Sequence, residues 1–441
     1  MTPPDPRQFR RVFAGLLLAM LLASLDQTIV TTALPTIVRD LGGLDQLSWV
    51  VTAYLLGATV SVPLWGRASD LYGRKTLFMA AIAVFLIGSA LSGAAGTLGQ
   101  LVAFRALQGL GAGGLMTLAM AIVGDIVSPR ERGRYQGYIQ MIFVLASVAG
   151  PLLGGLFADH ASWRWVFYVN LPIGAACLLL VGTSLHLPVE RKAVKLDYLG
   201  AALLAGALTC LLLATTRDAY ALYAGFAVLL VAFVVQERRA KEPVLPLRLF
   251  KTPVFDIVSA ALFLTTLAFF AVIVFMPVFL QTEIGVSATT SGVLMLSLLL
   301  AATASTTVSG RSISKTGRYK RFPLIGLAVM AVGLLALSTL DADSSKPAIV
   351  ALLAFFGLGF GLVSQVLTVA IQNAVDRRDL GIATASANLF RSLGGAVGTA
   401  LYGALYTGAS VFLYAAPAAI LGLLVVLLLE EVPLRGAMAA R

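Results

Sequence analysis

The chain has 441 residues, of which 59% are hydrophobic and 12% charged, and its mean hydropathy is +0.91. One water-soluble globule cannot bury so many apolar side chains, so the composition excludes a soluble protein and indicates an integral membrane protein. The net charge of +11 comes from basic residues spread through short loops, which favours membrane orientation over a nucleic-acid patch. Cys177 and Cys210 lie in apolar stretches far from histidine, so they indicate neither a disulfide framework nor a metal site.

Fourteen apolar stretches are each long enough to cross a bilayer core about 30 Å thick as a helix. They cover residues 13–38, 48–66, 76–95, 98–125, 135–157, 165–186, 197–215, 219–236, 254–280, 289–309, 322–340, 347–372, 381–406 and 409–429. The seventh and eighth are joined only by Arg217 and Asp218, and the last two almost touch. If one such pair were a re-entrant hairpin, the count would be twelve.

The distribution of basic residues predicts the orientation, because cytoplasmic loops are enriched in Lys and Arg. With the N-terminus inside, the loop Lys and Arg residues fall almost entirely on the cytoplasmic side; the exceptions are Arg39, Arg164, Arg217 and Lys346. We therefore expect both termini to be cytoplasmic, in a bacterial-type inner membrane. A cleaved signal peptide is an alternative for the first stretch, but apolar sequence continues to Val38, which favours an uncleaved span.

Two charged, proline-bearing connectors divide the chain at residues 187–196 and 237–253. They predict an N-terminal six-helix bundle (1–187), a linker with two extra transmembrane helices (188–253) and a C-terminal six-helix bundle (254–441). A weak repeat supports this division, because the loop 66–75 follows the second span of one half and the similar loop 310–320 follows the second span of the other. Equivalent loops at equivalent positions indicate duplicated halves, as in many secondary transporters.

A carboxylate lies near the middle of the first apolar stretch, where Asp26 costs roughly 2.5–3.5 kcal/mol on insertion scales. In the fourth stretch Arg105 lies about 10 Å below the outer boundary, and Asp26 lies about 19 Å above the inner one. The two depths nearly coincide in a 30 Å core, so an ion pair is geometrically possible. Its simplest interpretation is a structural tie between helices.

The same pair can also carry protons. Burial favours the neutral form of a carboxylic acid, whereas a neighbouring guanidinium favours the charged form. A conformational change that alters the pairing or the access of water would therefore load and release a proton. The hypothesis is that Asp26 and Arg105 couple transport to a proton gradient, with no other cofactor.

Several motifs together resemble the major facilitator superfamily, and within it the fourteen-helix drug:proton antiporter branch. They lie at residues 25–35 (LDQTIVTTALP), 66–75 (GRASDLYGRK), 101–113 (LVAFRALQGLGAG), 146–155 (ASVAGPLLGG) and 163–172 (WRWVFYVNLP). The resemblance implies an all-α membrane protein with two six-helix bundles around a central cavity and two additional helices, fourteen spans in all. It also implies alternating access, with export of amphipathic or cationic small molecules in exchange for protons. We expect a monomer whose partners are such substrates, protons and membrane lipids, and not nucleic acid.

The loop 66–75 is the expected cytoplasmic gate. Its candidate residues, together with an acid at the end of the fourth stretch, are Gly66, Asp70, Gly73, Arg74, Lys75 and Asp125. Asp70 would pair with the basic residues around a turn at Gly73 and bind basic groups or a helix N-terminus when that face closes. Ordinary positive-inside loop charge is the alternative. The chain departs from the family pattern at Leu71 and Ser314, so the second loop is expected to be a weaker latch.

The fifth stretch contains the motif that the resemblance associates with antiporters, formed by Gly150, Pro151, Gly154 and Gly155. Proline breaks the hydrogen-bond ladder, and the glycines leave a smooth face for bending and close helix contact. Tight packing alone would also explain them.

Polar residues inside other apolar stretches could line a substrate cavity. The candidates are Tyr54, Gln108, Gln136, Gln140, Asn170, Gln365, Asn388 and Arg391. A structural tie between helices is the alternative for Arg391.

We expect no enzyme, because residues 73–76 lack the spacing of a phosphate loop and no zinc-protease motif is present. Three other functions stay open: export or flipping of a lipid or lipid-linked molecule, import by proton symport, and a non-transporting membrane receptor or scaffold. The antiporter motif opposes symport, and the lack of a sizeable soluble domain opposes the receptor.

Overall fold

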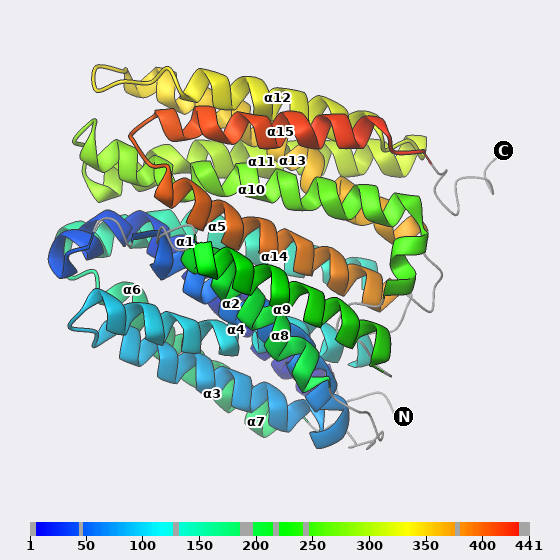
Figure 1. The fold of residues 1–441 in the computed structure, drawn as a ribbon. Helices are drawn as coiled ribbons and strands as arrows, with labels where there is room; N and C mark the ends of the chain where they lie inside the picture. The colour runs from blue at the N-terminus through cyan, green and yellow to red at the C-terminus, as the bar shows by residue number, and fades with distance from the viewer. Residues whose placement is uncertain are drawn as a thin grey trace. The chain divides into compact units, whose positions relative to one another are not determined.

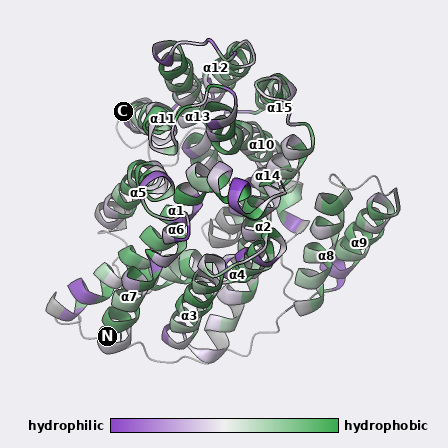
Figure 2. Ribbon diagram, turned by 90° about the vertical axis from the view of Figure 1, so that its left-hand side faces the viewer, coloured by the Kyte–Doolittle hydropathy of each residue, from purple (hydrophilic) through white to green (hydrophobic). Residues whose placement is uncertain are grey.

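The computed structural model describes residues 6–43, 47–126, 132–185, 197–214, 220–240, 247–374 and 380–431. These residues form α-helices joined by short turns (Figure 1). Most of the helical ribbon is hydrophobic (Figure 2), as expected of helices whose side chains lie in the apolar core of a bilayer. The chain divides into two compact units, Met1–Val244 and Leu245–Arg441.

The first unit is built around two long central helices that carry buried polar residues. Its helices are α1 (Pro6–Leu41), α2 (Leu47–Tyr72), α3 (Arg74–Gly93), α4 (Leu98–Ile126), α5 (Arg132–His160), α6 (Trp165–Tyr168), α7 (Asn170–Ser184), α8 (Tyr198–Ala214) and α9 (Tyr220–Arg239). Helix α1 packs on α5, α7 and α4, and α4 also packs on α2 and α3. Helices α8 and α9 pair with each other, and α8 also contacts α2.

The second unit repeats this pairing scheme. It consists of the 3-10 helix η2 (Leu247–Lys251) and the helices α10 (Pro253–Thr282), α11 (Ala288–Thr316), α12 (Arg321–Leu337), α13 (Lys346–Ala374), α14 (Leu380–Ala404) and α15 (Ser410–Leu427). Helix α10 packs on α14, α15 and α13 as α1 packs on α5, α7 and α4, and α13 packs on α11 and α12 as α4 packs on α2 and α3. The packing therefore extends the repeat from the two loops to whole helices.

Close backbone contacts occur at matching places in the two units. A Cβ atom at Gly109 of α4 would collide with the Tyr54 carbonyl oxygen of α2, and one at Gly357 of α13 would collide with the Leu298 carbonyl oxygen of α11. One turn later, Gly113 and Gly361 meet carbonyl oxygens of α2 and α11 in the same way. Small residues are required here because they let two helix backbones approach directly.

Each of the two similar loops has a glycine with positive φ at its turn. Gly73, between α2 and α3, has φ +89°, and Gly317, between α11 and α12, has φ +70°. Glycine adopts this left-handed region without steric cost, so it can end one helix and reverse the chain within a very short link.

The expectation of fourteen spans is wrong. Among the described residues, eleven helices are long and apolar enough to cross a membrane. Two further apolar helices, Leu199–Leu211 within α8 and Arg321–Leu337, are shorter than the others, and at 1.5 Å per residue a 17-residue helix extends only about 26 Å. Helix α14 is not among the eleven, because Asn388 and Arg391 lower its hydropathy.

We predict that Gly109→Ala destabilises the first unit, because the rigid carbonyl that a Cβ would meet cannot move away. Overpacking of this kind costs about 1–3 kcal/mol. The midpoint of thermal unfolding of the purified protein measures the effect. Gly99→Ala is the matched control in the same helix, since no heavy atom of the described chain lies within 4 Å of a Cβ there. An unchanged midpoint for Gly109→Ala would contradict the packing argument.

Candidate functional site

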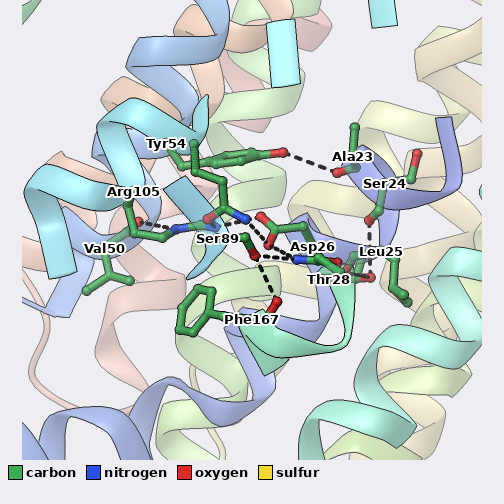
Figure 3. Close-up of polar contacts among 12 residues, drawn as sticks. Ala23, Ser24, Leu25, Asp26, Thr28, Val50, Tyr54, Ser89, Arg105 and Phe167 are labelled. Atoms are coloured by element: carbon green, nitrogen blue, oxygen red, sulfur yellow. Dashed lines mark hydrogen bonds and ion pairs between the residues drawn. The ribbon is translucent and has the colours of Figure 1, made fainter. Parts of the chain in front are cut away.

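A buried ion pair joins α1 to α4 in the first unit. Arg105 Nη1 lies 2.6 Å from Asp26 Oδ2, and the two side chains are 2% and 0% exposed (Figure 3). The structure thus brings together the two charged residues whose depths in the membrane were expected to coincide. A buried pair needs further hydrogen bonds to offset the loss of hydration of both charges.

Two amides supply those hydrogen bonds to the carboxylate. Gln108 Nε2 and Asn170 Nδ2 donate to Asp26 Oδ1 at 2.8 and 3.1 Å. Gln108 Oε1 accepts from Arg105 Nη1 at 2.7 Å, so one amide bridges the acid and the base. Together with Arg105, three donors hold the Asp26 carboxylate and offset part of the cost of burying it.

The guanidinium of Arg105 has contacts on its other sides. Its Nε donates to the Val50 carbonyl oxygen of α2 at 3.2 Å, and its Cζ lies 4.1 Å from the centre of the Tyr54 ring and 5.7 Å from that of Phe167. Tyr54 in turn donates its hydroxyl to the Ala23 carbonyl oxygen of α1 at 3.2 Å. Aromatic faces attract a cation, and they do so more strongly where water is excluded.

Helix geometry explains why these residues meet. Arg105 and Gln108 are three positions apart on α4, so their side chains leave the same face. Asn170 is the first residue of α7, and only Val169 separates it from the end of the short helix α6 at Tyr168. The Asn170 Nδ2 also donates to Ser89 Oγ of α3 at 3.0 Å, and Ser89 Oγ donates to the Phe167 carbonyl oxygen at 2.8 Å. The polar cluster of Asp26, Arg105, Gln108, Asn170 and Ser89 thus ties α1, α3, α4 and α7 together.

One atom of this polar cluster lacks a partner. The Asn170 Oδ1 is buried and accepts no hydrogen bond from any residue that the structure describes. A buried acceptor without a donor costs free energy, so its presence beside a titratable acid needs an explanation.

The motif in α5 packs against α1 close to Asp26. A Cβ at Gly150 would collide with the Thr28 side chain, and one at Gly154 would collide with the Ile29 carbonyl oxygen. The Thr28 hydroxyl donates to the Ala146 carbonyl oxygen of α5 at 3.1 Å. Pro151 lies inside the same helix, and Gly155 is buried there as well. The motif therefore places a close helix contact one turn from the acid.

The expected cytoplasmic gate is described only in part. Arg74 Nη1 donates to the Ala121 carbonyl oxygen of α4, and Lys75 Nζ donates to the Gly182 carbonyl oxygen of α7, both at 2.7 Å. Gly66 lies in α2, and Gly73 precedes α3. The side chains of Asp70 and Asp125 lie outside the described ones. Arg74 and Lys75 thus contact α4 and α7 near the C-terminal ends of these helices.

The expected cavity residues are divided by the structure. Tyr54, Gln108 and Asn170 do not line an open cavity here but are buried around Asp26 and Arg105, at 4%, 0% and 0% exposure. The side chains of Gln136 and Gln140 lie outside the described ones. In the second unit Gln365 and Asn388 are exposed, and Arg391 is half-buried against α13.

Sequence reasoning missed several contacts. Ser89 is one of several small residues in an apolar stretch, and nothing in the sequence distinguishes it from residues that only pack. At the other end of α1, Asp40 Oδ2 accepts from Trp163 Nε1 at 2.8 Å and from Arg164 Nη1 at 3.2 Å. Both donors belong to the motif 163–172. A cationic Arg164 in that motif was the sequence signal for an acidic partner such as Asp40. This second cluster ties the end of α1 to the turn before α6.

Comparison with known proteins identifies the family. A sequence model described as "Major Facilitator Superfamily" matches residues 16–399 and 258–439. The chain is 37% identical over 409 residues to "Multidrug transporter protein MdtP" of Bacillus subtilis, covering 90% of this chain and 75% of that protein. It is 40% identical over 406 residues to an "Uncharacterized MFS-type transporter" of Mycobacterium tuberculosis, covering 90% of this chain but only 59% of that protein's length.

A solved structure shows the same fold. The D-xylose-proton symporter superposes with a TM-score of 0.71 over 96% of this chain and 98% of that chain, at 17% sequence identity. At so low an identity, this similarity shows a shared fold and nothing about the substrate. The family match and the transporter-named relatives show that this multi-pass integral membrane protein is a transporter and not an enzyme, and that it belongs to the major facilitator superfamily.

Proposed function

We propose that this chain is a proton-coupled antiporter that exports amphipathic small molecules by alternating access. The observation that carries the proposal is Asp26, a fully buried acid in a membrane-spanning helix, held by one guanidinium and two amides. Ionisable residues inside membranes are costly, and they mark proton relays and ion pathways in pumps and transporters.

Proton loading would change the hydrogen bonds of the polar cluster. The ionised Asp26 accepts three of them, whereas a protonated acid must donate one and accepts fewer. The partnerless Asn170 Oδ1 can supply the acceptor: if the amide turns over, Oδ1 faces both the new Asp26 hydroxyl and the Ser89 hydroxyl. Ser89 would then donate to Asn170 instead of the Phe167 carbonyl oxygen, so protonation would be transmitted from α1 to the α6–α7 break.

The proton would also weaken the ion pair. A neutral Asp26 no longer attracts Arg105 as a charge, so α4 loses part of its attachment to α1. The close contact of Gly150 and Thr28 gives α5 a direct connection to the same turn of α1. Through these contacts a change of charge at Asp26 would become a change in helix packing, as alternating access requires.

The substrate class rests on the relatives. The B. subtilis relative is named a multidrug transporter, and the residues 146–155 resemble the motif of antiporters. We propose that the substrates are amphipathic drug-like molecules and that the proton gradient drives their export, with a monomer as the working unit. We also propose a bacterial-type inner membrane, with both termini and the loop 66–75 in the cytoplasm, where Asp70 and Asp125 would help to close the gate.

We predict that Asp26→Asn abolishes pH-gradient-driven transport while the protein still folds and inserts, because an amide has the acceptor oxygen and the donor group of the protonated acid but cannot take up or release a proton. Proteoliposomes with an imposed pH gradient, tested with a panel of lipophilic cations, lipophilic anions and antibiotics, measure the transport. We expect transport at the level of empty vesicles. Asp343→Asn, the same change at an exposed loop residue, is the control and should stay within about twofold of the unaltered protein. Normal gradient-driven export by Asp26→Asn would exclude the proposed coupling.

A second prediction separates coupling from a purely structural ion pair. Arg105→Leu leaves a buried carboxylate without its cation, which costs roughly 3–5 kcal/mol and should lower the thermal unfolding midpoint. The double variant Asp26→Leu/Arg105→Leu removes both charges, so we expect most of the stability to return while gradient-driven transport stays absent. If the double variant transports normally, the pair serves only to hold the helices.

The orientation can be tested with single cysteines in a chain whose Cys177 and Cys210 are replaced by serine. Arg318 and Asp343 are both exposed, in the loops at opposite ends of α12. In intact cells we expect a membrane-impermeant maleimide to label Asp343→Cys and to label Arg318→Cys only after permeabilisation. The reverse pattern would overturn the proposed orientation.

A further inference from the structure

The second unit contains a half-buried cation, Arg391, that no acid contacts among the described residues. Arg391 of α14 donates from Nη2 to Thr368 Oγ1 at 2.8 Å and to the Ser364 carbonyl oxygen at 3.4 Å, both on α13. No carboxylate contacts it within the part of the chain that the structure describes. Its Nε is buried and finds no acceptor among the same residues.

The contrast with Arg105 is direct. Arg105 is neutralised by Asp26, whereas the partners of Arg391 are a hydroxyl and a carbonyl, which carry no net charge. An ionised group in an apolar interior is stable only when paired or well hydrogen-bonded. No described residue of this unit supplies a negative charge to Arg391, so its guanidinium remains available to attract one.

The repeat shows that the second unit has no counterpart of the acid. Leu267 of α10 meets Gly398 as Ile29 of α1 meets Gly154, so Leu264 is equivalent to Asp26. By the matching glycines of α4 and α13, Leu353 is equivalent to Arg105. The second unit thus has leucines at the places of the ion pair, and its charge lies instead at Arg391, on the helix that corresponds to α5.

The groups beside Arg391 are those of an amphipathic binding site. The exposed amide of Gln365 follows Ser364 on α13, and the exposed amide of Asn388 lies one turn before Arg391 on α14. One turn before Ser364, the Phe360 ring stacks on Phe269 of α10, with centroids 3.8 Å apart and both residues partly exposed. A cation, two amides and an aromatic surface suit a ligand with an acidic group on an apolar body.

We propose that Arg391, with Thr368, Gln365 and Asn388, binds the acidic group of an amphipathic substrate, and that Phe269 and Phe360 contact its apolar part. The inference rests on the proposed export function and narrows it to organic anions and zwitterions. Cationic molecules would be repelled by the uncompensated guanidinium, so an acidic group and not a basic one would be the feature that the site selects. Thr368 is a positioning residue, since it holds the guanidinium through Nη2.

Equilibrium binding tests this proposal without any proton gradient. The full chain in phosphatidylcholine nanodiscs is titrated with 11-(dansylamino)undecanoic acid and with its methyl ester, and signals from empty nanodiscs are subtracted. The two probes share their apolar body and differ in charge. We expect the acid to bind about tenfold or more tightly than the ester, as a charge-assisted hydrogen bond allows. Equal affinities of the unaltered chain for the two probes would overturn the proposal.

Variants assign the preference to Arg391. Arg391→Gln should lose the preference for the acid but keep the affinity for the ester, and Arg391→Lys should retain part of the preference because the charge remains. Arg318→Gln, which removes an exposed loop arginine, is the control and should bind both probes like the unaltered chain. A preference for the acid that survives in Arg391→Gln would place the anion site elsewhere and refute the inference. If Arg391→Gln does not fold, the comparison of the two probes on the unaltered chain still decides.

Failure here and failure of the proton coupling can be told apart. Asp26→Asn should keep the preference for the acid over the ester, since Asp26 belongs to the first unit and all residues of the proposed anion site belong to the second. Loss of gradient-driven transport in Asp26→Asn with equal probe affinities would support the antiporter and reject the anion site. If instead the preference for the acid is preserved and Asp26→Asn transports normally, the anion site is supported and the proton coupling is rejected.

Discussion

The first unit depends on the need to satisfy one buried carboxylate. Water does not compensate the charge of Asp26, so the protein must bring donors to it from other helices. Arg105 and Gln108 come from α4, Asn170 from α7, and Ser89 of α3 holds Asn170. Because an unpaired charge inside a membrane is so costly, this requirement determines how four helices meet.

The two units use the same backbone contacts for different electrostatics. Gly109 and Gly357 bring equivalent helix pairs into backbone contact, and Gly73 and Gly317 reverse the chain at equivalent turns. Yet the first unit buries an ion pair with no net charge, whereas the second has leucines at those places and, among its described residues, no acid in contact with Arg391. Small residues set the shape of a helix pair without determining its chemistry, so duplicated helices can acquire a proton-carrying half and a ligand-binding half. The two proposals together assign proton coupling to the first unit and ligand binding to the second.

Some parts of the site were accessible from the sequence. Hydropathy located Asp26 and Arg105 inside apolar stretches, and a rise of 1.5 Å per residue placed them at similar depth. The roles of Tyr54, Gln108 and Asn170 were not accessible, because a helical period tells which residues share a face but not which face meets a partner. They were assigned to an open cavity, and the structure buries them against the ion pair. The span count failed for a related reason, since α12 and α14 are packed helices whose length or polarity falls short of the simple rule.

By itself the sequence determined that this is a helical membrane protein with duplicated halves, since apolar length and loop motifs are local properties that the chain carries wherever it folds. Only the tertiary structure decided that Asn170 and Ser89 complete the site of Asp26, and that Arg391 contacts a hydroxyl and a carbonyl but no acid among the described residues. Those facts depend on distances between helices that are far apart in the chain. Hydrogen bonds and ion pairs form only within a few ångströms, and helix packing sets those distances.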